Sequence, residues 1–170
     1  MEKRLEMTVS LPGIRIIGGL LLLIFSSRLA FPLPFSPVPV TAQTFAVLFL
    51  GIFLGKELAT ETVLLYLLMG SAGLPFFAAS GPFLMGPTAG YLLGFPFSAY
   101  LAGYFHEKGK LRDLPSRVLL LSLSSFPIYL GGLSWLSLFV GWKSALALGL
   151  FPFIPGDIIK ILILSALMGL

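Results

Sequence analysis

Residues 153–164 read FIPGDIIKILIL, an apolar stretch that carries one aspartate, Asp157, and one lysine, Lys160. No other charged residue lies between Ser144 and the C-terminus. A spacing of three places both side chains on one face of a helix. An ionised group near the centre of a bilayer costs at least about 2.5–3.5 kcal/mol, so such a pair persists only where the charges compensate each other or line a polar cavity.

Two interpretations of the pair stay open: an intrahelical ion pair that tightens packing, and part of a binding site for a small solute. Pro152 and Pro155, followed by Gly156, interrupt the stretch just before the pair. The chain is therefore expected to form a short helix, a break, and a final helix that begins near Pro155 or Gly156. Broken helices are a common way to build polar solute sites in membranes, and the break favours the second interpretation.

The composition of the whole chain predicts an all-α integral membrane protein. Hydrophobic residues make up 57% of the 170 residues and charged residues 11%, with a mean hydropathy of +1.01. Soluble domains carry about 25% charged residues. About six helices of ~20 residues with short loops use nearly the whole chain, so we expect residues 1–170 to form a single transmembrane domain.

The apolar runs between Pro, Gly and charged residues give the expected helices. The first run is read as a transmembrane helix, and not as a signal peptide, because equally apolar segments follow it. The expected ranges are 13–31, 41–55, 57–70, 84–105 and 116–139, followed by the broken segment 144–170.

The distribution of Lys and Arg predicts that both termini are cytoplasmic. Only two basic residues, Arg28 and Lys143, fall on the side opposite to the N-terminal tail. Eight others fall in the tail, at the start of the first helix and around the even-numbered loops: Lys3, Arg4, Arg15, Lys56, Lys108, Lys110, Arg112 and Arg117. The connections 32–40 and 71–83 then face outward, and both are uncharged and rich in Pro, Gly, Ser and Phe. They are either lids over a membrane cavity or tight external turns.

Small residues recur every four positions in the fourth helix, at Gly86, Gly90, Gly94, Ser98 and Ala102. Such a groove lets another helix backbone approach closely, and we expect it to serve packing inside the protein.

The start of the second helix carries a second polar group. Thr41 is suited to a helix N-cap, whereas the amide of Gln43 needs partners in an apolar helix and suits a urea or amide ligand. Hydroxyls from Ser80 and Tyr91 are expected to add to this site. The chain has no Cys and one His, so no metal site is expected, and its basic residues are better explained by membrane topology than by nucleic-acid binding.

Four stretches together resemble the BioY family of biotin-binding S components of energy-coupling factor (ECF) transporters. They are PVPVTAQTF (37–45), GLPFFA (73–78), GPTAGYLLGF (86–95) and PGDIIK (155–160), and they span nearly the whole domain. Residues 78–82, AASGP, depart from the family pattern because they lack an amide. Here Ser80 or backbone groups would have to supply that contact.

The resemblance implies a six-helix protein of the cytoplasmic membrane that captures biotin from outside and needs no cofactor. It also implies a membrane coupling protein (T component) and two cytoplasmic ATPases as partners. The residues expected near the ligand are Gln43, Phe77, Ser80, Tyr91, Asp157 and Lys160. Arg28 and Lys160 both stay open as partners of the biotin carboxylate.

Two other classes of function are weaker. An intramembrane enzyme acting on a lipid needs a nucleophile with a base, paired acids or a metal, whereas the membrane segments offer one acid and one base three residues apart. We therefore expect no catalytic residues. A channel needs a polar path through the bundle, but the polar residues gather toward one side.

Overall fold

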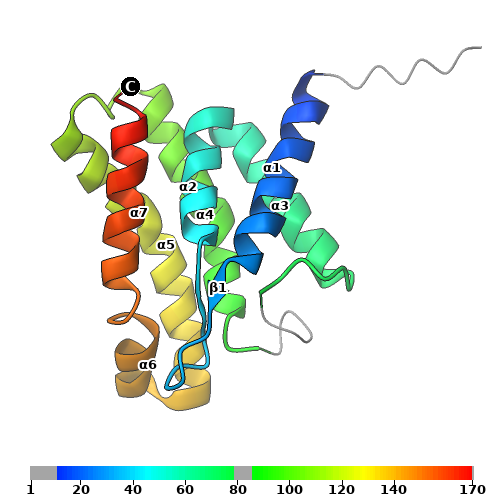
Figure 1. Cartoon of the computed structure of the whole chain (residues 1–170), viewed down its shortest axis with the longest axis vertical. Helices are drawn as coiled ribbons and strands as arrows, with labels where there is room; N and C mark the ends of the chain where they lie inside the picture. Colours follow the sequence, from blue (N-terminus) through cyan, green and yellow to red (C-terminus); the bar gives the residue numbers. More distant parts are fainter. Residues whose placement is uncertain (1–10, 79–85, 170) are drawn as a thin grey trace, which may run out of the picture.

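The structure is a computed structural model that describes residues 11–78 and 86–169 (Figure 1). These residues form seven α-helices and one two-stranded antiparallel ribbon, in which Ala30 pairs with Thr41 and Phe31 with Val40. The elements are α1 (Leu11–Arg28), β1 (Ala30–Phe31), β2 (Val40–Thr41), α2 (Gln43–Leu54), α3 (Lys56–Ser71), α4 (Ala89–Glu107), α5 (Leu114–Val140), α6 (Trp142–Gly149) and α7 (Ile154–Leu167).

Helix α4 is the centre of the bundle and packs against α5, α2 and α3. The start of α1 and the end of α7 lie at one end of the molecule, together with the α2–α3 and α4–α5 connections (Figure 1). The ribbon and α6 lie toward the opposite end. The first described helix therefore starts on the side where the last one ends, as the predicted topology requires. We call the end with the ribbon and α6 the outer end.

The outer faces of the helices carry large exposed apolar side chains, among them Ile17 and Phe25 of α1, Leu68 of α3 and Leu119 of α5. An exterior with so many exposed apolar side chains is suited to lipid rather than water. By length and hydropathy, α5 alone among the described helices has the character of a membrane span, and α6 with α7 would make a second, bent by 47°. Helices α2 and α3 have only 12 and 16 residues, below the ~20 of a perpendicular crossing.

Most predicted helix boundaries are close to those observed, and the break before the last helix is confirmed. Helix α7 begins at Ile154, with a proline in its first turn. The first helix was predicted too long: it ends at Arg28 and not at residue 31, because Ala30 and Phe31 pair with the strand that precedes α2. The fourth helix begins at Ala89, five residues after the predicted start at 84.

The small residues of α4 serve packing inside the protein, as predicted. A Cβ atom added at Gly90 would lie 2.2 Å from the carbonyl oxygen of Gly131 in α5, and one added at Gly94 would lie 2.5 Å from that of Pro127. Each four-residue step turns the row by about 40° around the helix axis. The first residues of the row therefore face α5 and the last ones face α2. A Cβ added at Gly51 of α2 would lie 2.9 Å from the Cβ of Ala102. Gly86 precedes the helix and takes no part in this close packing, since a Cβ added there would lie 3.9 Å from Thr88 Oγ1.

We predict that Gly94→Ala lowers the free energy of unfolding by about 1–3 kcal/mol, because the new methyl group meets α5 backbone atoms that cannot move aside. Gly18→Ala is the matched control, since nothing lies within 4 Å of the added Cβ in α1. There the better helix propensity of alanine should leave stability unchanged or raise it. Thermal unfolding of the two purified variants in detergent tests this, and equal midpoints would contradict the close α4–α5 contact.

Candidate functional site

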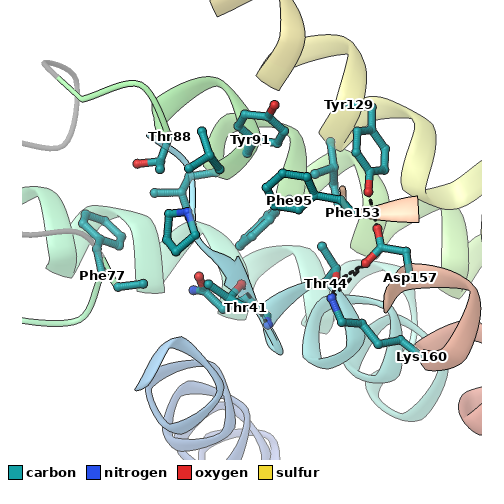
Figure 2. Close-up of a pocket in the computed structure, with 16 residues that line it drawn as sticks. Thr41, Thr44, Phe77, Thr88, Tyr91, Phe95, Tyr129, Phe153, Asp157 and Lys160 are labelled. Atoms are coloured by element: carbon teal, nitrogen blue, oxygen red, sulfur yellow. Dashed lines mark hydrogen bonds and ion pairs between the residues drawn. The ribbon is translucent and has the colours of Figure 1, made fainter. Parts of the chain in front are cut away.

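A partly open cavity of about 60 Å³ lies at the outer end of the bundle, between α2, α4, α5 and α7 (Figure 2). Side chains from these helices form its sides, and Val38, Pro39, Phe77 and Ala78 of the two outer connections complete the wall. Both connections therefore contribute to the wall of the cavity, and whether they act as lids or as tight turns stays a prediction. The full lining is Val38, Pro39, Thr41, Gln43, Thr44, Phe77, Ala78, Thr88, Tyr91, Leu92, Phe95, Ile128, Tyr129, Phe153, Asp157 and Lys160.

The break between α6 and α7 sets the position of Asp157. Helix α7 restarts at Ile154, and the backbone N–H of Asp157 donates to the carbonyl of Phe153 at 2.9 Å in its first turn. The positive end of the helix dipole favours a carboxylate at this place. Asp157 is only 8% exposed, so its charge needs partners inside the protein.

Those partners come from three helices and form a closed polar cluster (Figure 2). The ammonium group of Lys160, one turn along α7, lies 2.8 Å from Asp157 Oδ1 and donates to Thr44 Oγ1 of α2, also at 2.8 Å. Thr44 in turn donates to Asp157 Oδ1 at 3.2 Å, and the hydroxyl of Tyr129 in α5 donates to Asp157 Oδ2. We call Thr44, Tyr129, Asp157 and Lys160 the charged cluster.

The charged cluster keeps hydrogen-bonding capacity for a ligand. A carboxylate offers about four lone-pair sites and an ammonium group three donors. Among the described residues, Asp157 accepts three hydrogen bonds and Lys160 makes two. Asp157 therefore keeps one acceptor site and Lys160 keeps one donor, and the formal charges of the two residues cancel. A neutral ligand with both a donor and an acceptor suits this end of the cavity.

Aromatic rings form the middle of the cavity. The rings of Tyr91 and Phe153 are stacked with centroids 6.3 Å apart, and Phe95 and Tyr129 lie beside them (Figure 2). The hydroxyl of Tyr91 donates to the carbonyl of Gly149 at 2.9 Å, which ties α4 to the end of α6. This middle section suits the apolar body of a ligand.

A second, uncharged polar group lies around Gln43 at the start of α2. Gln43 is 3% exposed, and its Nε2 donates to the hydroxyl of Tyr66 at 2.7 Å. The fully buried Tyr66 of α3 donates in turn to the carbonyl of Phe76 at 2.9 Å. The amide of Gln43 therefore has the partner that its burial demands.

Five of the seven residues predicted for the site line this one cavity: Gln43, Phe77, Tyr91, Asp157 and Lys160. Arg28 does not line it; its side chain is exposed and donates to the carbonyl of Pro75. Ser80 lies outside the described residues.

Thr44, Tyr129 and Phe153 also line the cavity, and they were not predicted for the site from the sequence. Tyr129 carried a usable signal, because a tyrosine in the middle of an apolar helix needs a hydrogen-bond partner. Thr44 adjoins Gln43 but could have satisfied its own helix backbone. Nothing in the sequence distinguishes Phe153 from the other phenylalanines.

Residues 2–169 match the model of the BioY family. The chain belongs to this family. A probable biotin transporter BioY from Pyrococcus horikoshii is 42% identical over 127 residues, which cover 73% of this chain and 74% of that relative. The biotin transporter BioY of Thermotoga maritima is 38% identical over 144 residues, which cover 81% of this chain and 82% of that relative.

The fold is also similar to a crystal structure of the S-component for biotin from an ECF-type ABC transporter. The TM-score is 0.72 at 26% sequence identity, and the match covers 92% of this chain and 85% of the other. The resemblance predicted from four sequence stretches is thereby confirmed, together with the all-α fold of a BioY membrane protein.

The ion pair within the cluster should be strongly coupled, and a double-mutant cycle tests this. We predict that Lys160→Leu alone lowers the free energy of unfolding by about 3 kcal/mol, because it leaves the buried Asp157 without its cation. The free energy of unfolding should fall less in the double variant Asp157→Leu/Lys160→Leu than in the single variant Lys160→Leu. Additive losses in thermal unfolding, measured without any ligand, would contradict the coupling.

Proposed function

We propose that this protein binds biotin with high affinity at the outer side of the cytoplasmic membrane and supplies it for uptake. In this proposal it is the substrate-specific component of an ECF-type transporter, and it does not alter biotin chemically. The observation that carries the proposal is a cavity with aromatic walls that ends in a buried charged cluster without net charge. The curated relatives carry names of biotin transporters, which supports the choice of ligand.

In this proposal the ureido ring of biotin lies against Asp157 and Lys160. A urea group has N–H donors and a carbonyl acceptor, and the charged cluster has one acceptor site and one donor to offer them. The rings of Tyr91, Phe153 and Phe77 would enclose the apolar bicycle and the chain that leads to the carboxylate.

The carboxylate is proposed to point toward Arg28 and away from Lys160. The charge of Lys160 is already matched by Asp157 at 2.8 Å, so a second carboxylate there would place two negative charges against one positive charge. Arg28 is exposed at the outer end, beside the connection that contributes Phe77 to the cavity. A guanidinium group can bind a carboxylate there through two hydrogen bonds.

The proposal places the chain as a multi-pass protein in the cytoplasmic membrane, where it works with a membrane coupling protein and two cytoplasmic ATPases. The sequence has no Gly-x-x-x-x-Gly-Lys loop, so ATP hydrolysis would have to come from partner chains. The similar crystal structure is of a component of an ECF-type ABC transporter, which supports this kind of assembly.

Equilibrium binding of radiolabelled biotin to the purified protein tests the site. We predict that Asp157→Asn and Lys160→Ala each weaken binding at least about 30-fold, the equivalent of about 2 kcal/mol, because each leaves a buried group without its partner. Lys143→Ala is the matched control, since this exposed lysine of α6 does not line the cavity.

The same assay with biotin amide distinguishes the roles of Arg28 and Lys160. Arg28→Ala should weaken the binding of biotin but not of its amide, whereas Lys160→Ala should weaken both. Unchanged biotin affinity in both Asp157→Asn and Lys160→Ala would reduce the pair to a packing role. Turnover of a membrane lipid by a protein indifferent to biotin would instead indicate an intramembrane enzyme.

A further inference from the structure

A second and larger hollow lies beside the central cavity, on the surface between α5, α6 and α7. We call it the lateral groove. Its volume is about 470 Å³, which is within the about 300–1,000 Å³ of ordinary ligand sites, against about 60 Å³ for the central cavity. Phe126, Leu130 and Ile158 line the groove and are each more than half exposed, so the groove opens onto the apolar exterior of the bundle.

The lining of the lateral groove is suited to an apolar group. Its residues on α5 and α7 are apolar except for Tyr129, Asp157 and two serines. The hydroxyls of Ser122 and Ser125 donate to carbonyls of their own helix, at 2.7 Å and 3.1 Å. Their hydrogen bonds are therefore made within α5, and an alkyl group suits this groove better than a charged group does.

Tyr129 and Asp157 line both the central cavity and the lateral groove. On α5, the preceding residue Ile128 lines only the cavity. On α7, Lys160 lines only the cavity and Ile158 lines only the groove. Tyr129 and Asp157 thus each lie at the border between two faces of their helix, one toward each space.

These two residues are joined across the seam between α5 and α7. The hydroxyl of Tyr129 donates to Asp157 Oδ2 (Figure 2). The ring of Tyr129 also meets the ring of Tyr91 edge-on, with centroids 6.4 Å apart. Farther from the outer end, Leu121 of α5 and Leu164 of α7 are completely buried in one apolar cluster. At the level of the charged cluster, the ring of Tyr129 and its hydrogen bond therefore lie between the cavity and the groove.

We propose that Tyr129 is a specificity-determining residue that limits the size of the ligand at the charged cluster. In the proposed binding mode the ureido ring lies against Asp157 and Lys160. A substituent on the ureido nitrogen that faces Asp157 then has to pass Tyr129. The ring excludes this substituent, although an alkyl group would fit the lateral groove behind it. The inference rests on the proposed function, because it takes the ureido ring to lie at this end of the cavity.

This selectivity is a repulsive one, since the ring blocks larger ligands and is not needed to attract biotin itself. Removal of the ring would join the cavity to the groove. A variant with a small side chain at Tyr129 should therefore accept ligands that the wild type rejects. A gain of binding of this kind is not expected from a general loss of stability.

Equilibrium binding of biotin and of two derivatives, with a butyl group on one or the other ureido nitrogen, tests the proposal. The purified wild type should bind both derivatives at least about 100-fold more weakly than biotin. In Tyr129→Ala, the ratio of the two affinities should fall at least about tenfold for one derivative or both. The ratio is measured on one variant at a time, so a general loss of affinity from the missing hydrogen bond cancels.

Three further variants separate the ring from other effects. Tyr129→Phe keeps the ring and loses only the hydroxyl, so the ratio should stay close to that of the wild type. Phe126→Ala enlarges the groove at a residue that does not line the cavity, and it should leave the ratio unchanged as well. Tyr129→Val also removes the ring, and it replaces Tyr129→Ala if that protein is not folded and monodisperse.

A diazirine at the end of the butyl chain reports where the chain lies. After illumination of the complex with Tyr129→Ala, mass spectrometry of peptides should find the label on residues of the lateral groove, such as Leu130 or Ile158. A label on Thr88 or Phe95, which line only the central cavity, would overturn the proposal, because the cavity itself would then have widened.

The affinity ratios also have outcomes that contradict the proposal. A wild type that binds a butyl derivative as tightly as biotin would overturn it. So would an unchanged ratio in folded Tyr129→Ala or Tyr129→Val that still binds biotin, or an equal fall in Tyr129→Phe or Phe126→Ala. If the wild type itself does not bind biotin, the proposed function fails and this inference fails with it.

Discussion

The ion pair between Asp157 and Lys160 is the constraint on which this structure depends. Both charges lie in a helix whose other side chains are apolar or small, so they have to find partners inside the bundle. Thr44 of α2 and Tyr129 of α5 supply them, and the cluster thereby fixes α7 relative to two other helices. The same contacts place a donor and an acceptor at the end of a cavity with aromatic walls. Stability and ligand recognition thus depend on one set of atoms.

Close packing of backbones places the aromatic part of the site. Tyr91 has its ring against Gly132, where an added Cβ would lie 2.3 Å from the ring, and its hydroxyl beside Gly149, where the distance would be 2.2 Å. Gly90 and Gly94 on either side of Tyr91 bring α4 onto the backbone of α5. Small residues therefore decide where this large one lies, and a methyl group at these positions would displace the cavity wall.

Much of this arrangement could be predicted from the sequence, for physical reasons. Two charges in an apolar stretch after a proline break indicate a buried polar site, and glycines every four residues indicate a packed helix face. The ribbon at Ala30–Phe31 was missed because two-residue strands leave no periodic pattern. Thr44 and Tyr129 were missed because their roles depend on which helices meet in space, which spacing along one helix does not reveal. Arg28 does not line the cavity, and its expected place beside the ligand stays a prediction.

The central proposal is that the charged cluster binds biotin. Native mass spectrometry of the protein, purified without added ligand from cells grown with biotin, tests this claim most directly. We expect one biotin on each chain of the wild type and none on Asp157→Asn, although both proteins remain folded and monodisperse. A different small molecule or a lipid product in the wild type, or biotin retained equally by both proteins, would contradict the account.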